Sequence, residues 1–310
     1  MTLNVLFAGR PERWDEYEPA LTTALAEAGL NTRLATDIPP GEVDYIVYAP
    51  NGPVSDFRPF TRARAVLSLW AGVETIVDNP TLTQPLCRMV DEGLRLGMAE
   101  WVAGHALRHH LGTDLDVRRA PGDWTQRTPP LARERPVTIL GLGELGQTAA
   151  QILTGIGFPV AGWSRTPKDI PGITCLPGPD GLKQALASAQ ILVLLLPDTP
   201  ETTTILNART LALLPRGAFI LNPGRGPLID DDALIAALDS GQVAHATLDV
   251  FRKEPLPEDH PFWRHPHVTV TPHIAADTRP KTAARVIAEN IRRSEAGEPL
   301  LHLVDRAHGY

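Results

Sequence analysis

Residues 137–147 read Val-Thr-Ile-Leu-Gly-Leu-Gly-Glu-Leu-Gly-Gln, an apolar run followed by a glycine-rich turn and a helical pattern. Strand, tight turn and helix in this order are the setting in which a G-x-G-x-x-G motif binds the pyrophosphate of a dinucleotide. We expect Gly141 to permit the turn, Gly143 to admit phosphate close to the backbone, and Gly146 to let helix and strand pack. The helix N-terminus would supply N–H groups to the anion. A purely structural turn is the alternative.

Two α/β patterns make up the rest of the chain. From residue 136 short apolar runs alternate with helical stretches, and one run, Ile-Leu-Val-Leu-Leu-Leu, is typical of a parallel strand covered on both faces. The first hundred residues have the same alternation without a phosphate loop, so the first domain is not the cofactor domain. Strands are expected at residues 3–8, 45–49, 65–70, 137–140, 160–163, 191–196, 218–221 and 246–250, and helices at 14–29, 86–111 and 279–297.

These patterns predict the α/β class, with two Rossmann-like or flavodoxin-like domains built on doubly wound parallel sheets. A chain of 310 residues fits two domains. Because the last helix runs well past the final strand, we expect it to return to the first domain. The predicted domains are residues 1–103 plus 282–310 for the substrate and 104–281 for NADP. The irregular stretch 112–135 is long enough to serve binding or subunit contact.

Composition argues against several classes of function. A formal net charge of −7 argues against a nucleic-acid-binding protein, which usually has a basic face. The sequence contains no run of about 18 apolar residues, which a membrane-spanning helix would require. Cys87 and Cys175 have neither disulfide-like nor zinc-like spacing, and we expect both to be buried thiols in a reducing cytoplasm. The ten histidines lack the spacing that zinc prefers, so no metal site is expected, and we expect a helix-dipole or packing role for His109 and His110 at a helix end.

The residues that end the second strand of the nucleotide domain bear on the choice of cofactor. NAD-specific proteins usually have Asp or Glu there to bind the ribose hydroxyls, whereas this chain has Trp163-Ser164-Arg165. Arg165 would attract a 2′-phosphate and Ser164 could donate a hydrogen bond to it. A charge-assisted hydrogen bond contributes about 1.5–3 kcal/mol. We therefore expect a preference for NADPH, with NAD as the second option; a solvent-facing arginine is the alternative.

Three residues that could carry chemistry follow the glycine loop, namely Arg225, Glu254 and His273. Arg225 stands between glycines directly after a predicted strand, where ligands bind in open α/β sheets, and its guanidinium can pair with a planar carboxylate. A structural arginine that bridges loops is the alternative. His273, near a proline and small residues at a strand end, is of little use as a core residue. A carboxylate partner favours its protonated form, which can donate the proton that ketone reduction requires.

Taken together, these motifs resemble the D-2-hydroxyacid dehydrogenase family over essentially the whole chain, and within it the bacterial reductases of glyoxylate and hydroxypyruvate. One departure is Glu74, where many relatives have Asp. Besides the glycine loop, the resemblance rests on the segments 222–226 (Asn-Pro-Gly-Arg-Gly), 248–251 (Leu-Asp-Val-Phe), 253–255 (Lys-Glu-Pro) and 271–276 (Thr-Pro-His-Ile-Ala-Ala), and the subgroup on 69–73, 105–110, 162–165 and 304–306.

The resemblance implies a role for each residue. His273 would be the acid/base, Glu254 its carboxylate partner, and Arg225 the clamp on the carboxylate and carbonyl of the substrate. The active site would lie in the cleft between the domains, where the backbone amides of Ala71 and Gly72 would hold the substrate carboxylate. The implied cofactor-binding residues are Gly141, Gly143, Glu144, Leu145, Gly146, Ser164, Arg165, Pro197 and Asp249, and Asp249 would contact the nicotinamide carboxamide.

The expected activity is the NAD(P)H-dependent reduction of small 2-oxo acids, glyoxylate to glycolate and hydroxypyruvate to D-glycerate. The expected partners are the small 2-oxo or 2-hydroxy acid and a second copy of the chain in a homodimer, with neither nucleic acid nor membrane. One alternative is an NAD-dependent dehydrogenase of another D-2-hydroxy acid. A second is a non-catalytic, cofactor-sensing protein similar to the corepressors that share this scaffold.

Overall fold

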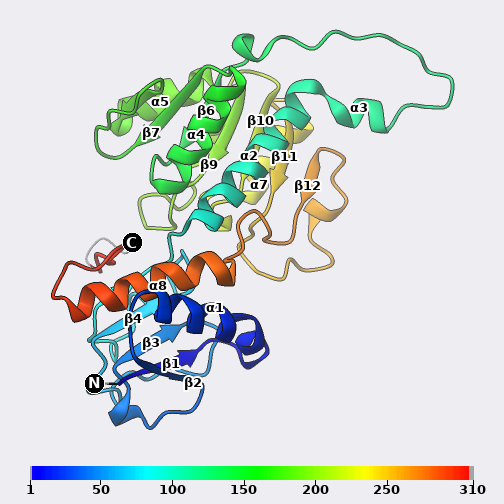
Figure 1. The fold of residues 1–310 in the computed structure, drawn as a ribbon. Helices are drawn as coiled ribbons and strands as arrows, with labels where there is room; N and C mark the ends of the chain where they lie inside the picture. Colours follow the sequence, from blue (N-terminus) through cyan, green and yellow to red (C-terminus); the bar gives the residue numbers. More distant parts are fainter. Residues whose placement is uncertain (1, 307–310) are drawn as a thin grey trace. The chain divides into compact units, whose positions relative to one another are not determined.

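The computed structural model describes residues 2–306, which divide into two compact units (Figure 1). Unit 1 consists of the described residues up to Leu94 together with those from Thr278 onward, and unit 2 is Arg95–Asp277. The domain bounds expected from the sequence, 103 and 281, lie further along the chain than Leu94 and Asp277, by nine residues at the first junction and four at the second. Residues 1 and 307–310, which the predicted first domain includes, lie outside the described residues.

Unit 1 is built on a parallel sheet of five strands in the order β2-β1-β3-β4-β5, which is the flavodoxin-like order. Helices α1 and α8 pack against one face of this sheet, where Val5 and Phe7 point, and Leu6 points to a second apolar cluster on the other face. The elements are β1 (Leu3–Ala8), η1 (Pro11–Arg13), α1 (Trp14–Glu27), β2 (Thr32–Ala35), η2 (Pro40–Glu42), β3 (Tyr45–Tyr48), β4 (Ala65–Ser68), β5 (Leu86–Cys87) and α8 (Pro280–Glu295).

Unit 2 is built on a parallel sheet of seven strands in the order β12-β11-β10-β9-β6-β7-β8. This is the Rossmann order with one further edge strand, and the order reverses between β6 and β9. The helices are α2 (Glu92–Leu111), α3 (Thr113–Val117), η3 (Ala132–Glu134), α4 (Glu144–Ile156), α5 (Gly178–Ser188), α6 (Ala208–Leu211), η4 (Gly226–Leu228), α7 (Asp231–Asp239) and η5 (Pro261–Trp263). The strands are β6 (Val137–Leu140), β7 (Val160–Ser164), β8 (Thr174–Pro177), β9 (Ile191–Leu194), β10 (Ala218–Asn222), β11 (Val243–Leu248) and β12 (Val268–Val270).

Strand β9 shows why its sequence is apolar without alternation. Ile191 and Val193 are fully buried in a cluster with residues of α2 and α4. Leu192 and Leu194 are fully buried in a second cluster with residues of α5, α6 and α7. Both faces of the sheet are therefore covered by helices, as expected for a parallel sheet. The predicted fold class of two doubly wound α/β domains is confirmed.

Some local predictions were wrong. The helix expected from residue 86 begins at Glu92, because Leu86–Cys87 pairs with β4 as strand β5. The side chain of Asp91 accepts hydrogen bonds from the backbone N–H groups of Gly93 and Leu94, which fixes the helix start there. Cys175 is only half-buried, whereas Cys87 is buried as expected, and both are free thiols. Among the described residues, no helix is long and apolar enough to cross a membrane.

The end of α2 and the sheet of unit 2 enclose two buried histidines. The rings of His109 and His245 lie 5.1 Å apart, and the His109 ring stacks on Phe219 at 4.8 Å. Their Nε2 atoms lie 2.9 Å from the hydroxyls of Thr247 and Thr269 respectively. Burial lowers the pKa of His109 to about 3 and the pKa of His245 to about 4. Of the two roles expected for His109, helix dipole or packing, the structure shows the packing role.

These two histidines should make the protein less stable in acid. Between the ordinary histidine pKa of 6.5 and about 4, the unfolded chain binds protons at both positions and the folded chain does not. The free energy of unfolding therefore falls as pH falls, by up to about 1.4 kcal/mol per pH unit for each histidine. Urea unfolding measured from neutral to mildly acidic pH should show that the free energy of unfolding falls less steeply with falling pH in His109→Gln than in the wild type. An unchanged dependence of the free energy of unfolding on pH would contradict this account.

Candidate active site

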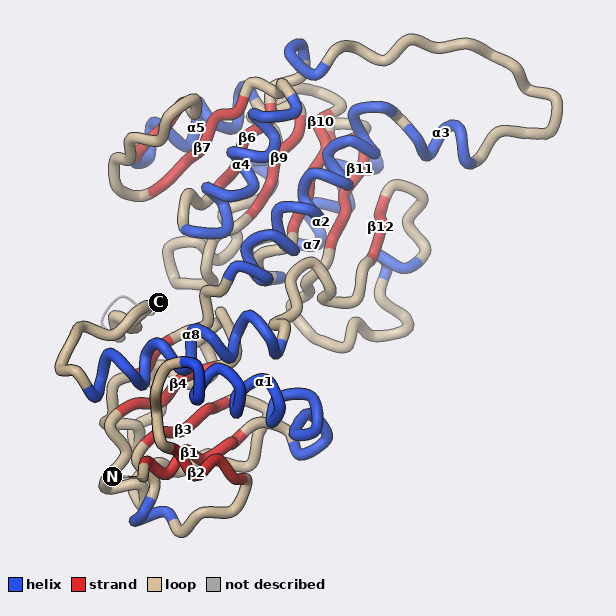
Figure 2. Tube along the Cα trace, viewed as in Figure 1, coloured by secondary structure: helices blue, strands red, loops and turns tan. Residues whose placement is uncertain are grey.

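The candidate residues of unit 2 follow the carboxyl ends of strands in a single sheet. Gly141 follows β6, Pro197 comes after β9, Arg225 follows β10, Glu254 comes after β11, and His273 follows β12. Strands β10, β11 and β12 are neighbours, as Figure 2 shows. Because all the strands are parallel, these loops emerge at the same edge of the sheet, where open α/β sheets bind their ligands.

The central pair of this site is His273 and Glu254. Nδ1 of His273 lies 2.7 Å from Oε2 of Glu254, and both side chains are partly exposed. The second carboxylate oxygen, Oε1, accepts a hydrogen bond of 2.9 Å from the backbone N–H of Phe251, which orients the carboxylate. With Nδ1 held by Glu254, Nε2 is the ring atom at which His273 can exchange a proton with a substrate.

The turn that carries His273 has an uncommon backbone conformation. His273 has a φ of 55°, in the left-handed region that few residues other than glycine adopt. The fully buried carboxylate of Asp249 holds this turn, since it accepts hydrogen bonds from the hydroxyl of Thr271 (2.5 Å) and from the N–H groups of Ile274 and Ala275 (2.9 Å each). Asp249 therefore orients the turn that carries His273, and its expected contact with the nicotinamide stays a prediction.

The loop after β10 places Arg225. The buried side chain of Asn222 shapes it, because Oδ1 accepts from the N–H of Gly224 (3.2 Å) and Nδ2 donates to the carbonyl of Arg225 (3.0 Å). The guanidinium Nη1 donates to the carbonyl of Gly224 at 2.7 Å. A Cβ atom on Gly226 would lie 2.0 Å from the carbonyl carbon of Phe251, so only glycine fits there. The loops that carry Arg225 and Glu254 are thus in direct contact.

Arg252 strengthens that contact. Its guanidinium Nη2 donates to the carbonyl of Pro227 at 3.3 Å and also to the carbonyl of Ile229, both in the segment after β10. Burial raises the pKa of nearby Asp231, and the positive charge of Arg252 acts in the opposite direction. Arg252 lies two positions before Glu254 and braces its loop, a role that sequence reasoning missed because nothing in the local pattern distinguishes it from a surface arginine.

The glycine loop provides room for a bound pyrophosphate. Gly141 has a φ of 107°, and a Cβ there would lie 2.4 Å from the carbonyl oxygen of Leu195. A Cβ on Gly146 would lie 1.9 Å from the carbonyl oxygen of Gly141. Gly143, the N-cap of α4, is exposed, and a Cβ there would meet no protein atom within 4 Å. The protein itself requires the first and third glycines, and the open space at the second fits an external phosphate.

The other predicted cofactor residues lie close to this loop in sequence or topology. Glu144 and Leu145 form the first turn of α4, at the positive end of its dipole. Arg165 is exposed directly after β7, the strand next to β6. Ser164 is buried, and its hydroxyl donates to the carbonyl of Thr166 at 2.7 Å. The hydrogen bond expected from Ser164 to a 2′-phosphate therefore has an internal competitor and stays a prediction.

Three further predicted residues have only their local positions described. Pro197 is half-buried after β9, and its carbonyl accepts a hydrogen bond of 2.6 Å from the hydroxyl of Thr202. Ala71 and Gly72 belong to unit 1, follow β4 and are half-buried. The contact of these two backbone amides with a substrate carboxylate stays a prediction.

The comparisons with known proteins agree with this arrangement. Residues 103–275, more than half of the chain, match the model of the D-isomer specific 2-hydroxyacid dehydrogenase, NAD binding domain. The chain is also 37% identical over 316 aligned residues to glyoxylate/hydroxypyruvate reductase A of Serratia proteamaculans, with 99% of this chain and 100% of that protein covered. The chain belongs to the D-2-hydroxyacid dehydrogenase family. The resemblance stated from the motifs is thereby confirmed.

Two solved structures of D-2-hydroxyacid dehydrogenases are similar over the full chain. One, from Xanthobacter autotrophicus, is in complex with NADPH and MES; it is 41% identical, with a TM-score of 0.92 and complete coverage of both chains. The other is the NADPH-dependent glyoxylate/hydroxypyruvate reductase of Sinorhizobium meliloti in complex with NADP and sulfate. It is 35% identical, with a TM-score of 0.83, and the match covers 100% of this chain and 99% of that one.

Proposed function

We propose that the protein reduces short 2-oxo acids with NADPH, and that glyoxylate and hydroxypyruvate are its substrates. The observation that carries the proposal is the 2.7 Å hydrogen bond between His273 and Glu254 at the sheet edge that also carries the glycine loop. A proton donor and a dinucleotide site at the same edge are what ketone reduction needs. The names of the similar Serratia and Sinorhizobium proteins support the choice of substrates.

Each protein residue has a defined task in this reaction. The bound nicotinamide supplies the hydride that reduces the ketone carbon. Arg225 pairs with the substrate carboxylate and polarises the carbonyl, with a contribution from the amides of Ala71 and Gly72. Protonated His273 donates its Nε2 proton to the developing alkoxide, and Glu254 stabilises the positive imidazole. A general acid in this position typically contributes about 10²–10⁴-fold to the rate.

The preference for NADPH rests on Arg165 and on the absence of an acidic residue at the end of β7. An aspartate or glutamate at this position would bind the ribose hydroxyls of NAD and would repel a 2′-phosphate. Exposed Arg165 offers that phosphate a charge-assisted partner instead. The NADPH and NADP in the two similar structures support this assignment. Use of NAD with lower efficiency is compatible with the same site.

Arg165→Ala should remove much of the discrimination between the two cofactors. A single charge-assisted hydrogen bond contributes about 1.5–3 kcal/mol, which corresponds to about ten- to hundredfold. The ratio of kcat/KM for NADPH to kcat/KM for NADH should fall by that factor, with little change in the values for NADH. Steady-state assays with both cofactors measure it, and exposed Arg209→Ala on α6 is the control. If the NADPH preference survives the substitution, this role of Arg165 is wrong.

The two alternative functions make different predictions in the same assays. An NAD-dependent dehydrogenase of another D-2-hydroxy acid would turn over NADH faster than NADPH and would prefer a 2-oxo acid other than glyoxylate or hydroxypyruvate. A cofactor-sensing protein would bind NADPH without oxidising it in the presence of any 2-oxo acid. The hydrogen-bonded pair of His273 and Glu254 favours catalysis over sensing, because sensing requires no proton donor.

We also propose that the protein is a homodimer of the 33.6 kDa chain. The segment after α2 runs away from the rest of unit 2 (Figure 1) and exposes large apolar side chains, among them Val117 (84% exposed) and Trp124 (88%). Burying such residues against a second copy would stabilise the assembly. A molecular mass of one chain in solution would contradict the homodimer.

The proposed location of the protein is the cytoplasm, with which the free thiols of Cys87 and Cys175 agree.

A further inference from the structure

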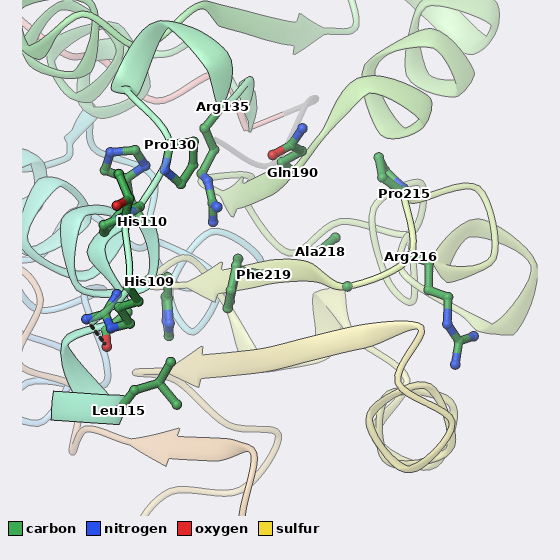
Figure 3. A pocket seen from close by; sticks show the side chains of 15 residues that line it. His109, His110, Leu115, Pro130, Arg135, Gln190, Pro215, Arg216, Ala218 and Phe219 are labelled. Atoms are coloured by element: carbon green, nitrogen blue, oxygen red, sulfur yellow. Dashed lines mark hydrogen bonds between the residues drawn. The ribbon is translucent and has the colours of Figure 1, made fainter. Parts of the chain in front are cut away.

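A cavity of about 580 Å³ lies in unit 2 away from the catalytic loops (Figure 3). Its wall includes the segment that leads into β10 and the first residues of that strand, whereas Arg225 follows the other end of β10. The end of α2, the segment 127–130, Arg135 and Gln190 complete the wall. The cavity therefore opens at the amino ends of the strands, and its volume is in the range of small-molecule sites.

The ionisable side chains that line the cavity are all basic. The described residues that form it include three arginines, Arg127, Arg135 and Arg216, and two histidines, but neither Asp nor Glu. This contrasts with the net charge of −7 for the whole chain. Arg127 pairs with Asp116 outside the lining, and Arg216 donates to the carbonyl of Ser240 at 2.6 Å. The remaining arginine, Arg135, has no carboxylate partner among the described residues.

Two polar atoms of the lining are buried without a hydrogen-bond partner among the described residues. They are Nε of Arg135 and Nδ1 of His110, and the His110 side chain is more than nine-tenths buried. Leaving such buried groups unpaired destabilises the fold, and more so when the group is charged. Burial and the nearby charge of Arg135 both lower the pKa of His110, which favours the neutral imidazole, and a neutral imidazole has one N–H to donate.

The cavity also has an apolar side. The Arg135 guanidinium carbon lies 5.7 Å from the centre of the Phe219 ring, and that ring stacks on His109. Figure 3 shows Arg135 reaching toward Phe219, with His110 and Pro130 on one side and Gln190 on the other. A cationic fork beside a flat aromatic surface suits an anionic group attached to a small apolar or aromatic body.

We propose that this cavity is a second ligand site, which binds a small organic anion bearing a phosphate or carboxylate group. Arg135 holds the anionic group through its fork, His110 adds a hydrogen bond, and the Phe219 side contacts the apolar body. The site is independent of the reductase reaction, because no catalytic or cofactor-binding residue lines it. A ligand there would stabilise the base of the segment 112–135, where Arg127 donates a hydrogen bond to the carbonyl of Gly112.

Calorimetric titration of the NADP-saturated full-length protein tests the site, with phenyl phosphate, inorganic phosphate and benzoate as probes. Phenyl phosphate should bind more tightly than inorganic phosphate, and comparison with benzoate distinguishes a phosphate site from a carboxylate site. Arg135→Gln should weaken binding of phenyl phosphate by about ten- to hundredfold. The neighbouring exposed Arg133→Gln, outside the lining, is the matched control and should bind like the wild type.

Two results would overturn the proposal. One is that wild-type protein binds none of the probes, as expected if a second copy of the chain fills the cavity. The other is that Arg135→Gln and wild type bind phenyl phosphate equally, which would place the anion elsewhere, for example at Arg225. Should Arg135→Gln fail to fold, Arg135→Lys keeps the charge and loses the fork. It should then show a smaller but measurable weakening, and unchanged affinity in that variant would equally reject the site.

Discussion

His273→Asn should lower kcat for glyoxylate by about 10²–10⁴-fold while NADPH binding stays intact. The reason is that the alkoxide formed by hydride transfer must be protonated, and Nε2 of His273 is the donor in this account. Asparagine is the informative replacement because it tolerates the left-handed backbone that His273 adopts, with its φ of 55°. His273→Ala should lose turnover to a similar extent, with an added cost from backbone strain.

Stopped-flow or steady-state assays measure the loss, and fluorescence titration of NADPH shows whether the cofactor site survives. Exposed His267→Asn, six positions earlier, is the control for loss of a surface histidine. Near-normal turnover of His273→Asn would remove His273 as the proton donor. Weak NADPH binding together with lost turnover would point instead to a structural role for the turn that Asp249 holds.

Arg225→Lys should raise KM and lower kcat together. A lysine keeps the positive charge, but it cannot present two parallel donors to a planar carboxylate and polarise the carbonyl from the same fork. Loss of one charge-assisted hydrogen bond corresponds to about ten- to hundredfold in kcat/KM. The hydrogen bonds of Asn222 should keep the loop in place in the variant, so the effect should be confined to substrate steps.

The matched control for this substitution is Arg264→Lys, an exposed arginine after η5. Its kinetics should equal those of the wild type. If Arg225→Lys also has unchanged kinetics, Arg225 is a structural residue that bridges loops. If KM rises and kcat does not change, Arg225 contributes to binding alone and takes no part in polarising the ketone.

Some features could be predicted from the sequence because they follow from local patterns. The apolar run of β9 predicted a strand buried on both faces, and the glycine loop predicted the strand-turn-helix unit of β6 and α4. By contrast, strands β2 and β8 were missed, since each lies at an edge of its sheet and none of their residues is fully buried. A strand that packs weakly on either side leaves little hydrophobic periodicity to recognise.

Only part of the candidate site could likewise be predicted from the sequence. The sequence singled out His273 and Glu254 by residue type, and the structure brings them within hydrogen-bond distance. It did not predict that Asp249 holds the turn of His273 or that Arg252 braces the loop of Glu254. Those roles depend on hydrogen bonds between segments that come together only when β10, β11 and β12 are neighbours. Spacing along the chain carries no information about such contacts.

The central claim is that this edge of the sheet reduces short 2-oxo acids with NADPH, and one assay tests it directly. The purified wild-type protein is mixed with NADPH and either glyoxylate or hydroxypyruvate, and loss of the reduced-nicotinamide absorbance is followed. Our account predicts multiple turnovers with equimolar formation of glycolate or D-glycerate, at higher kcat/KM than with NADH. Tight binding of NADPH with no oxidation in the presence of either acid would contradict it.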